Sequence, residues 1–476
     1  MKEFFKKPEN KINIVFWGLV FLLAFFPLGF GGNRPLPYSL SSLFVGILLL
    51  IWGLSIYQKR DLSKVSMRHL WFIVFPFLAV MLWTLIQALI PLKLLGNPVW
   101  LMASDITGSS LSPVITLDRY KTLTSFMKFL SYGVVFWLSL QLGRKEENAR
   151  KIIYAIIFAS IAYAIYGIAM HLSGVEKVLW HEKRMYAKNL TSVFINRNSY
   201  ATYANIGIIC TLAFMIKKIF EHVGHKKNKQ YYLTIINNIT DKGIYYIFAL
   251  LLIFAALLMT GSRAGLVCGL IAIFGFFIIS SFAGSSSKNR TLIFAIAFII
   301  ISSLGFLVMA NSDAVYKRFS SIDEEISQRG KIYEQTIAAT GDFPIYGSGL
   351  GTFEEVFTMY KGDSIGERMT ARIDLAHNTY LETMLEVGIP AFILLFTSII
   401  SCLIICFRGL VTRKRDNIYP AITLAVSIAV WLHAFFDFSI QMPAIAVTYA
   451  AILGVGVAQS WSTRTSMSDR SEKCPN

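Results

Sequence analysis

Charged residues are scarce in this sequence. They make up 15% of its 476 residues, whereas 55% are hydrophobic and 14% are aromatic. A soluble protein of this size usually carries about 25% charged residues. The composition therefore argues against a soluble core, and it suggests that the net charge of +17 has a source other than nucleic-acid binding.

Motifs for metals, nucleotides and disulfides are also lacking. The sequence has no HExxH and no Walker motif, and no cysteine lies near histidine in a metal-binding spacing. The segment "GSGLGTF", 347–353, follows no strand pattern, so we interpret it as a turn between loop helices. We predict neither a metal nor a cofactor. No cysteine falls in a loop that we assign below to the outer side, which excludes a disulfide there; the five are Cys210, Cys268, Cys402, Cys406 and Cys474.

Long apolar runs, in contrast, recur along the whole chain. Runs of about 20 apolar residues are long enough to cross a bilayer as helices. We predict an all-α polytopic membrane protein with about twelve spans and no strand pattern. The spans are 12–33, 39–57, 70–92, 125–142, 152–172, 200–216, 243–260, 264–283, 291–310, 380–407, 419–437 and 443–460.

The spans divide the chain into four parts. The first nine spans and their short loops form 1–310, and a long loop with short helices occupies 311–379. The last three spans lie in 380–460, and 461–476 is a tail. If the N-terminus is cytoplasmic, the cytoplasmic segments hold 27 of the 45 basic residues. This bias predicts cytoplasmic termini and a periplasmic long loop, and it attributes much of the positive charge to anionic lipid headgroups.

One short loop departs from that bias. The 174–199 loop is basic although it lies on the outer side. It is either a solvated loop that tolerates charge or an anion site at the membrane surface. Its charged residues are Lys177, Lys183, Arg184, Lys188 and Arg197, with Glu176 and Glu182.

Two further segments fall on the same side. In "MTGSRAGL", 259–266, Arg263 is the only charge, and it either snorkels to headgroups or binds an anion. Thr379 and Glu382 form a predicted capping box, so His377 lies just before a helix N-terminus. The positive end of the helix dipole favours a neutral imidazole there, which can act as a general base. Glu382 is either a cap alone or part of a site.

The outer face thus gathers Arg197, Arg263 and His377, with Arg372 and His433 nearby. Guanidinium groups bind diphosphate oxygens in a bidentate fork, and a base beside them suits attack by a hydroxyl. Outside a bacterial inner membrane no nucleoside triphosphate is available. A diphosphate donor there has to be linked to a lipid.

The sequence resembles the O-antigen ligase superfamily. This superfamily includes O-antigen ligases, O-antigen and exopolysaccharide polymerases and some pilin oligosaccharyltransferases. The resemblance covers about 190–445, in five segments in the same order as in the family. They are "SVFINRNSYATYAN", "TGSRAGL", "RGKIYEQTIAATGDFPIYGSGLGTFEEVF", "HNTYLETMLEVGIPA" and "LHAFFDFSIQMPA".

The resemblance implies a GT-C-like helical fold in the bacterial inner membrane and a metal-independent, inverting glycosyltransferase. It implies an undecaprenyl-diphosphate-linked glycan donor and a saccharide acceptor, and the partners could include polysaccharide export machinery. His377 would be the catalytic base, and Arg197, Arg263 and Arg372 would hold the diphosphate. Supporting roles would fall to Asn198, Gly349, Gly351, Asn378, His433 and Asp437, with Gly347 shaping the long loop; Asp437 can equally cap a helix or pair with an arginine.

Two alternatives remain at this stage. A transporter or flippase commonly has twelve spans, but it should carry charges near the bilayer midplane. Only Lys128 and Glu386 lie well within the predicted spans.

Between polymerase and ligase, the long loop slightly favours a polymerase, because an acidic cover suits a neutral sugar better than a phosphate-rich lipid A core. Against seven basic residues, it holds Asp313, Asp323, Glu324, Glu325, Glu334, Asp342, Glu354, Glu355, Asp363, Glu367 and Asp374.

Overall fold

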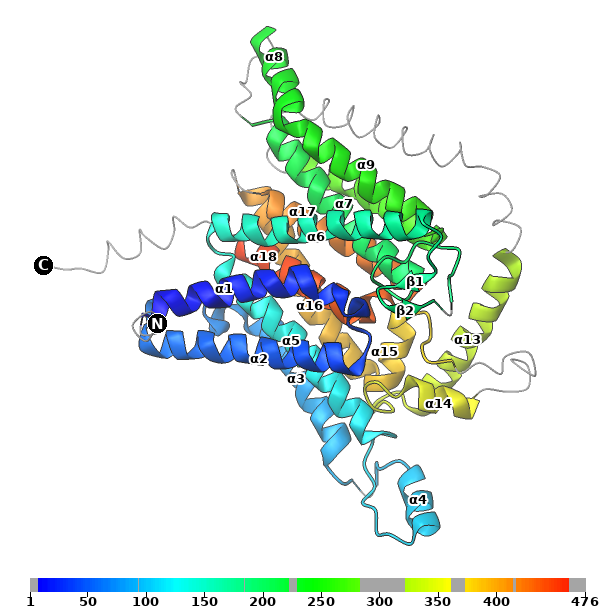
Figure 1. Ribbon diagram of the computed structural model, residues 1–476. Coiled ribbons are helices and arrows are strands. Elements are labelled where there is room, and N and C mark those ends of the chain that lie inside the picture. Colours follow the sequence, from blue (N-terminus) through cyan, green and yellow to red (C-terminus); the bar gives the residue numbers. More distant parts are fainter. Residues whose placement is uncertain are drawn as a thin grey trace, which may run out of the picture.

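The computed structural model of the protein describes residues 7–92, 94–183, 185–221, 229–282, 322–360, 373–413 and 417–461. Within these ranges the chain is almost entirely helical (Figure 1), which confirms the all-α prediction. The α-helices are α1 (Pro8–Phe25), α2 (Pro35–Gln58), α3 (Trp71–Leu89), α4 (Val99–Thr107), α5 (Arg119–Leu142), α6 (Glu146–Leu172), α7 (Arg197–Ile219), α8 (Lys229–Asn238), α9 (Ile244–Met259), α10 (Arg263–Ser281), α13 (Ile322–Asp342), α14 (Phe353–Tyr360), α15 (Thr379–Val387), α16 (Ile389–Thr412), α17 (Ile418–His433) and α18 (Pro443–Ala458).

The remaining elements are short. Two strands, β1 (Lys177–Val178) and β2 (His181–Glu182), pair as an antiparallel hairpin in the basic 174–199 loop. The sequence pattern did not indicate this hairpin, because strands of two residues are too short to show an alternation of apolar and polar residues. A π-helix covers Ile239–Gly243, and short 3₁₀ helices cover Phe26–Leu28, Phe30–Gly32, Arg60–Leu62, Met67–Leu70 and Ser439–Gln441.

Most of the predicted membrane spans correspond to helices. Nine helical stretches in the described residues are long and apolar enough to cross a membrane, and α17 and α18 are shorter apolar helices. The predicted span 291–310 lies outside the described residues, as do 311–321 and 361–372 of the long loop. Large apolar side chains on α2 are exposed at helical spacing, as expected of a face that contacts lipid; they are Leu36, Leu40, Leu43, Ile47, Leu50 and Leu54.

The structure divides the predicted span 380–407 at Gly388. This glycine has φ +82°, a conformation that side chains rarely adopt, and it separates α15 from α16. Only α16 is long and apolar enough to cross a membrane. Glu386 therefore belongs to α15 and not to the spanning helix, contrary to the prediction from sequence.

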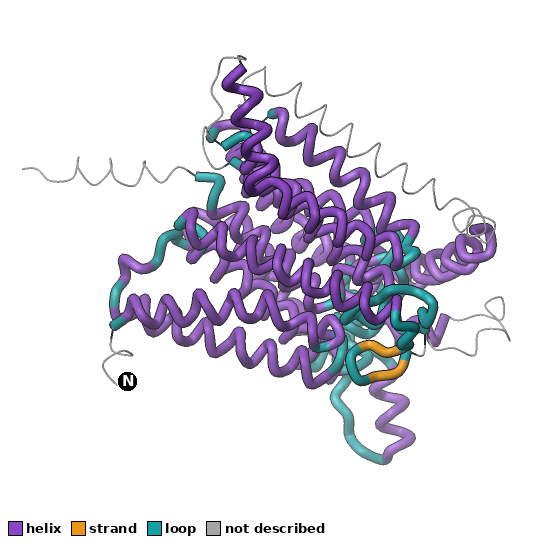
Figure 2. The backbone as a smooth tube through the Cα atoms, turned by 45° about the horizontal axis from the view of Figure 1, so that its top comes forward, coloured by secondary structure: helices purple, strands orange, loops and turns teal. Residues whose placement is uncertain are grey.

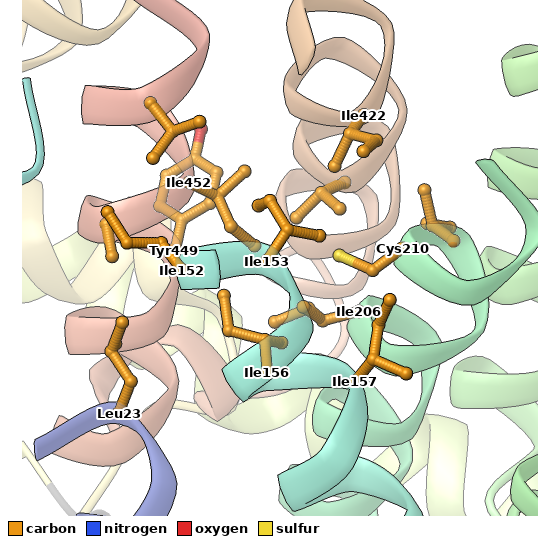
Figure 3. Packing of buried hydrophobic residues seen from close by; sticks show 14 of the residues in the cluster. Leu23, Ile152, Ile153, Ile156, Ile157, Ile206, Cys210, Ile422, Tyr449 and Ile452 are labelled. Carbon is orange, nitrogen blue, oxygen red and sulfur yellow. The ribbon is translucent and has the colours of Figure 1, made fainter. Parts of the chain in front are cut away.

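Helix α7 forms the centre of the bundle, and its residues 198–216 are all buried. It packs against α6, α9, α10 and α17. Figure 3 shows this core, in which α6 lies between α1 and α18 on one side and α7 and α17 on the other. The labelled side chains are Leu23, Ile152, Ile153, Ile156, Ile157, Ile206, Cys210, Ile422, Tyr449 and Ile452.

Small residues allow α7 to approach its neighbours closely. A Cβ at Gly207 would overlap the side chain of Ser160 on α6, and one at Gly269 on α10 would overlap Asn205. Helices in membranes commonly associate through such small residues, because lipid provides no hydrophobic force between helices. The position of α7, and so of the residue at its start, is fixed by this close packing.

The elements of the basic loop and of the long loop lie at one end of the bundle. Figure 1 shows the β1–β2 hairpin and α13, α14 and α15 at the right, opposite the start of α1. Figure 2 shows the same separation after the molecule is turned, with the orange strands far from the N-terminus. The N-termini of α7, α10 and α15 lead from this end, where the predicted site residues are found.

Candidate active site

The first turn of α10 packs against the second and third turns of α7. Asn205 Nδ2 donates to the carbonyl oxygen of Gly265 at 2.8 Å. A Cβ at Gly265 would overlap the side chain of Ala201. Since Arg197 is the first residue of α7 and Arg263 the first residue of α10, the two arginines begin adjacent helices at the same end. Two positive helix ends, each with an arginine as its first residue, thus lie in one region, which suits an anion.

The environment of Arg197 includes an unused donor. Its guanidinium lies over the ring of Tyr186, 5.3 Å from the centroid. Its Nε is buried and makes no hydrogen bond to any residue that the structure describes. A buried donor without a partner costs about 1–3 kcal/mol. An anionic ligand at this position would supply the missing acceptor.

Helix α15 begins at the residue after its cap, Asn378. The side-chain oxygen of Asn378 accepts the backbone N–H groups two and three residues later, at 3.1 and 3.2 Å. Asn378 is therefore the cap, and the predicted capping box of Thr379 with Glu382 is wrong. Glu382 reaches past the cap instead, and its Oε2 accepts the backbone N–H of Ala376 at 2.8 Å. The carboxyl of Glu382 thereby fixes the residue immediately before His377.

His377 is held in an unusual conformation with one free nitrogen. Its φ is +54°, in the left-handed region, and Tyr333 donates from its hydroxyl to the His377 carbonyl oxygen at 3.0 Å. The imidazole packs on Phe438 with 4.9 Å between ring centroids. Nδ1 is buried and has no hydrogen-bond partner among the described residues. Burial, together with the positive charge of Arg329, lowers the pKa of His377 to about 4, so the ring is neutral at neutral pH.

The loop after α17 connects the separate parts of the site. Thr379 donates its backbone N–H to the carbonyl oxygen of Ala434 at 2.9 Å, which ties the start of α15 to this loop. Asn198, in the first turn of α7, donates from its amide to Asp437. Arg329 Nη1 donates to the carbonyl oxygen of the residue before Asp437 at 2.8 Å. Through these bonds the starts of α7 and α15 and the helix α13 meet at 434–438.

The carboxyl of Asp437 is fully buried in this region. It accepts from Asn198 and, at 2.7 Å, from the backbone N–H of Phe438. Burial raises the pKa of Asp437 to about 6, although these hydrogen bonds and the charges of Arg329 and Arg197 oppose that rise. The structure thus gives Asp437 a positioning contact with the first turn of α7.

His433, the last residue of α17, contacts α7. It is fully buried, and its Nδ1 hydrogen-bonds the hydroxyl of Thr202 at 2.6 Å. Its Nε2 has no partner in the described part of the chain. Since this ring packs between two helices of the core, His433 contributes to their docking, and His377 is the histidine at the surface of the site.

The three loop glycines belong to the opposite end of α15. Gly347, Gly349 and Gly351 have φ of +67°, +110° and +86°, and they form the predicted turn, between α13 and α14. Gly349 donates its N–H to the carbonyl oxygen of Glu386 at 2.9 Å. A Cβ at Gly349 would overlap Thr116. The turn therefore anchors the end of α15 instead of contacting the arginines.

Two residues of α13 complete the site and were not singled out by the sequence. Arg329 and Tyr333 are four residues apart, so they share a helix face, and both hydrogen-bond the backbone around 377 and 435–436. The spacing of Arg329 and Tyr333 in the segment "RGKIYEQ" could have indicated that both lie on one face of a helix. Arg372 lies outside the described residues. In the part that the structure describes, no three His, Cys, Asp or Glu side chains are grouped as a metal site.

Residues 248–396 match a family model described as O-antigen ligase. The matched segment contains Arg263, Arg329 and His377, whereas Arg197 and Asp437 lie on either side of it. No curated protein matches the chain. The match confirms the family resemblance seen in the sequence.

Proposed function

We propose that this chain, whose residues 248–396 resemble O-antigen ligases, is a membrane protein of that superfamily and joins glycans during the synthesis of surface polysaccharide. The donor would be a glycan on undecaprenyl diphosphate, and the acceptor a sugar hydroxyl. The reaction would take place at the periplasmic face of a bacterial inner membrane, with both termini in the cytoplasm.

The convergence of the three helix starts carries this proposal. Arg197 and Arg263 begin neighbouring helices, and His377 precedes the third, joined to the first through Asp437 and Asn198. Fixed guanidinium groups bind a diphosphate, and a neutral imidazole with a free nitrogen accepts a proton. Each group would have a distinct role in one displacement.

In that displacement the acceptor oxygen attacks the anomeric carbon of the donor sugar. The bond from this carbon to the phosphate oxygen breaks, and its electron pair leaves with the lipid diphosphate. The proton of the acceptor hydroxyl passes to His377. The arginines stabilise the negative charge that grows on the leaving group, and the single attack inverts the anomeric configuration.

Donor binding would also raise the pKa of the proposed base, His377. In the free protein, burial and Arg329 lower the pKa of His377 to about 4, which makes it a weak proton acceptor. A diphosphate bound beside it adds negative charge, which favours the protonated ring and raises this pKa. The base would then become effective only when the donor is in place.

The acidic character of the long loop favours a polymerase, so we expect deletion of the gene to leave glycolipids capped with a single repeat unit. The measurement is the size distribution of the surface glycolipids and of the lipid-linked intermediates. Full-length polymer on undecaprenyl diphosphate, with an unmodified lipid A core, would instead identify a ligase. If the deletion strain still makes full-length polymer and still attaches it to the lipid A core, both activities would be contradicted.

The proposed orientation has a separate test. A periplasm-dependent phosphatase fused after Lys361 should be active, because the charge bias places the long loop outside. The same fusion after Lys227 should be inactive, although both proteins are made in comparable amounts. The opposite pattern would place the arginines and His377 in the cytoplasm, where a periplasmic transfer is impossible.

A further inference from the structure

A cavity of about 740 Å³ lies beside α15, away from the arginines. One face of α15 lines it, through Thr379, Glu382, Thr383 and Glu386, which recur at helical spacing. Arg197, Arg263, Arg329 and His377 are absent from its wall as the described residues form it. The cavity therefore lies beside α15 but apart from these four residues.

Most of the wall is apolar and comes largely from helices of the membrane bundle. Side chains of α3, α5, α16 and α18 contribute, and examples are Phe77, Phe129, Leu395, Ile399, Ala450 and Leu453. A space of this size among apolar helices can hold a hydrocarbon chain.

The end of the cavity next to α15 is polar. Lys128 reaches it from α5, with its ammonium 5.3 Å from the centroid of the Tyr38 ring, and its charge acts on Glu386 and Glu382. Gln441 also contributes to the wall, close to Glu382. Glu386 Oε1 accepts the backbone N–H of Phe353 at 3.2 Å. Lys128, Gln441, Glu382 and Glu386 can each form further hydrogen bonds in addition to those described.

The carboxyls at this end do not suit an anion. Both are almost completely buried, with 3% of Glu382 and 6% of Glu386 exposed. Burial raises the pKa of each above its ordinary value, so they carry protons more readily than exposed carboxyls and can donate hydrogen bonds. Among the residues that the structure describes, no arginine lines the cavity. Hydroxyl groups, which both donate and accept, match this set of groups better than a diphosphate does.

We propose that this cavity is a second ligand site, for an amphiphile with a hydrocarbon chain and an uncharged, hydroxyl-bearing head group. The chain lies among the apolar helices, and the hydroxyls bind Lys128, Glu382 and Glu386. Because Glu382 also holds the N–H of Ala376, occupancy of the head-group end acts on the backbone of His377. Binding here does not depend on the proposed transfer reaction.

Photolabelling of the full-length protein in phosphatidylcholine nanodiscs tests the site. The probe is a dodecyl maltoside that carries a diazirine in its alkyl chain. We expect labelled peptides from α5, α16 and α18, and competition by dodecyl maltoside but not by dodecyl phosphate. Equal competition by dodecyl phosphate, or labelling elsewhere only, would overturn the proposal, and neither result depends on a variant.

Variants then locate the two ends of the ligand. Ala450→Phe should fill the apolar part, and Lys128→Met should remove a charged hydrogen-bond donor, each lowering labelling by about tenfold. Lys151→Met is the matched control, because its ammonium also lies over an aromatic ring, that of Trp17 at 5.8 Å, but outside the cavity. Undiminished labelling in both cavity variants would also overturn the proposal.

Binding of farnesyl diphosphate to the same samples separates this site from the proposed function. A protein that takes up the maltoside probe in the cavity but binds no farnesyl diphosphate would contradict the diphosphate site and retain this one. The reverse result would retain the diphosphate site and reject the amphiphile site.

Discussion

Replacement of His377 should lower the rate of glycan transfer by about 10²–10⁴-fold, the usual contribution of a general base. His377→Asn is the preferred variant, because asparagine tolerates the left-handed backbone that φ +54° requires. It therefore removes the base with little added strain. The measurement is transfer from a purified lipid-diphosphate donor to a saccharide acceptor, with donor binding measured in parallel.

His181→Ala is the control for this variant, since His181 is exposed in the hairpin at the same end of the molecule. We expect it to keep the normal rate. His377→Asn should still bind the donor, because the arginines remain. A normal transfer rate in His377→Asn would remove this residue from the role of base.

The pH dependence gives an independent check on the same residue. The neutral ring is the active form, and its pKa in the free protein is lowered to about 4. Thus kcat/KM should stay high as the pH falls through 6.5 and decline only near pH 4. Arg329→Gln removes a charge that lowers this pKa, so the decline should move to higher pH. A decline centred on 6.5 in the unsubstituted protein would contradict the neutral buried imidazole.

Arg197→Lys and Arg263→Lys should each reduce transfer by about 10²–10³-fold, the cost of removing one donor that stabilises developing charge. Lysine keeps the positive charge but lacks the planar fork that binds two oxygens of a diphosphate. For Arg197, the loss also includes the Nε donor, which has no partner in the described protein. The measurements are transfer rate and binding of farnesyl diphosphate.

Arg119→Lys is a matched control for the first of these variants. Like Arg197, Arg119 is the first residue of a long helix, and its guanidinium lies over an aromatic ring, that of Trp100 at 4.8 Å. It begins α5 instead of α7, so we expect little change. Normal transfer in both Arg197→Lys and Arg263→Lys, with normal amounts of protein in the membrane, would show that these arginines only contact headgroups.

The sequence alone determined the class of this protein and most of its membrane helices. Apolar runs about 20 residues long have few structural alternatives, because a helix satisfies all its backbone hydrogen bonds within lipid. Arg197, Arg263 and His377 were also predictable as residues at helix starts, since each lies where an apolar run begins on one side. Arg372 and the span 291–310 stay predictions, because they lie outside the described residues.

Only the tertiary structure decided which of these residues meet and what lies between them. The contact of Asn198 with Asp437, and the hydrogen bond from Arg329 near the same carboxyl, join residues more than 100 positions apart. The sequence left Glu382 as either a cap alone or part of a site, and the structure shows that it holds the residue before His377 and lines a cavity. Local spacing cannot foresee such contacts, because they follow from the close packing of α7 with its neighbours and from the turn at Gly388.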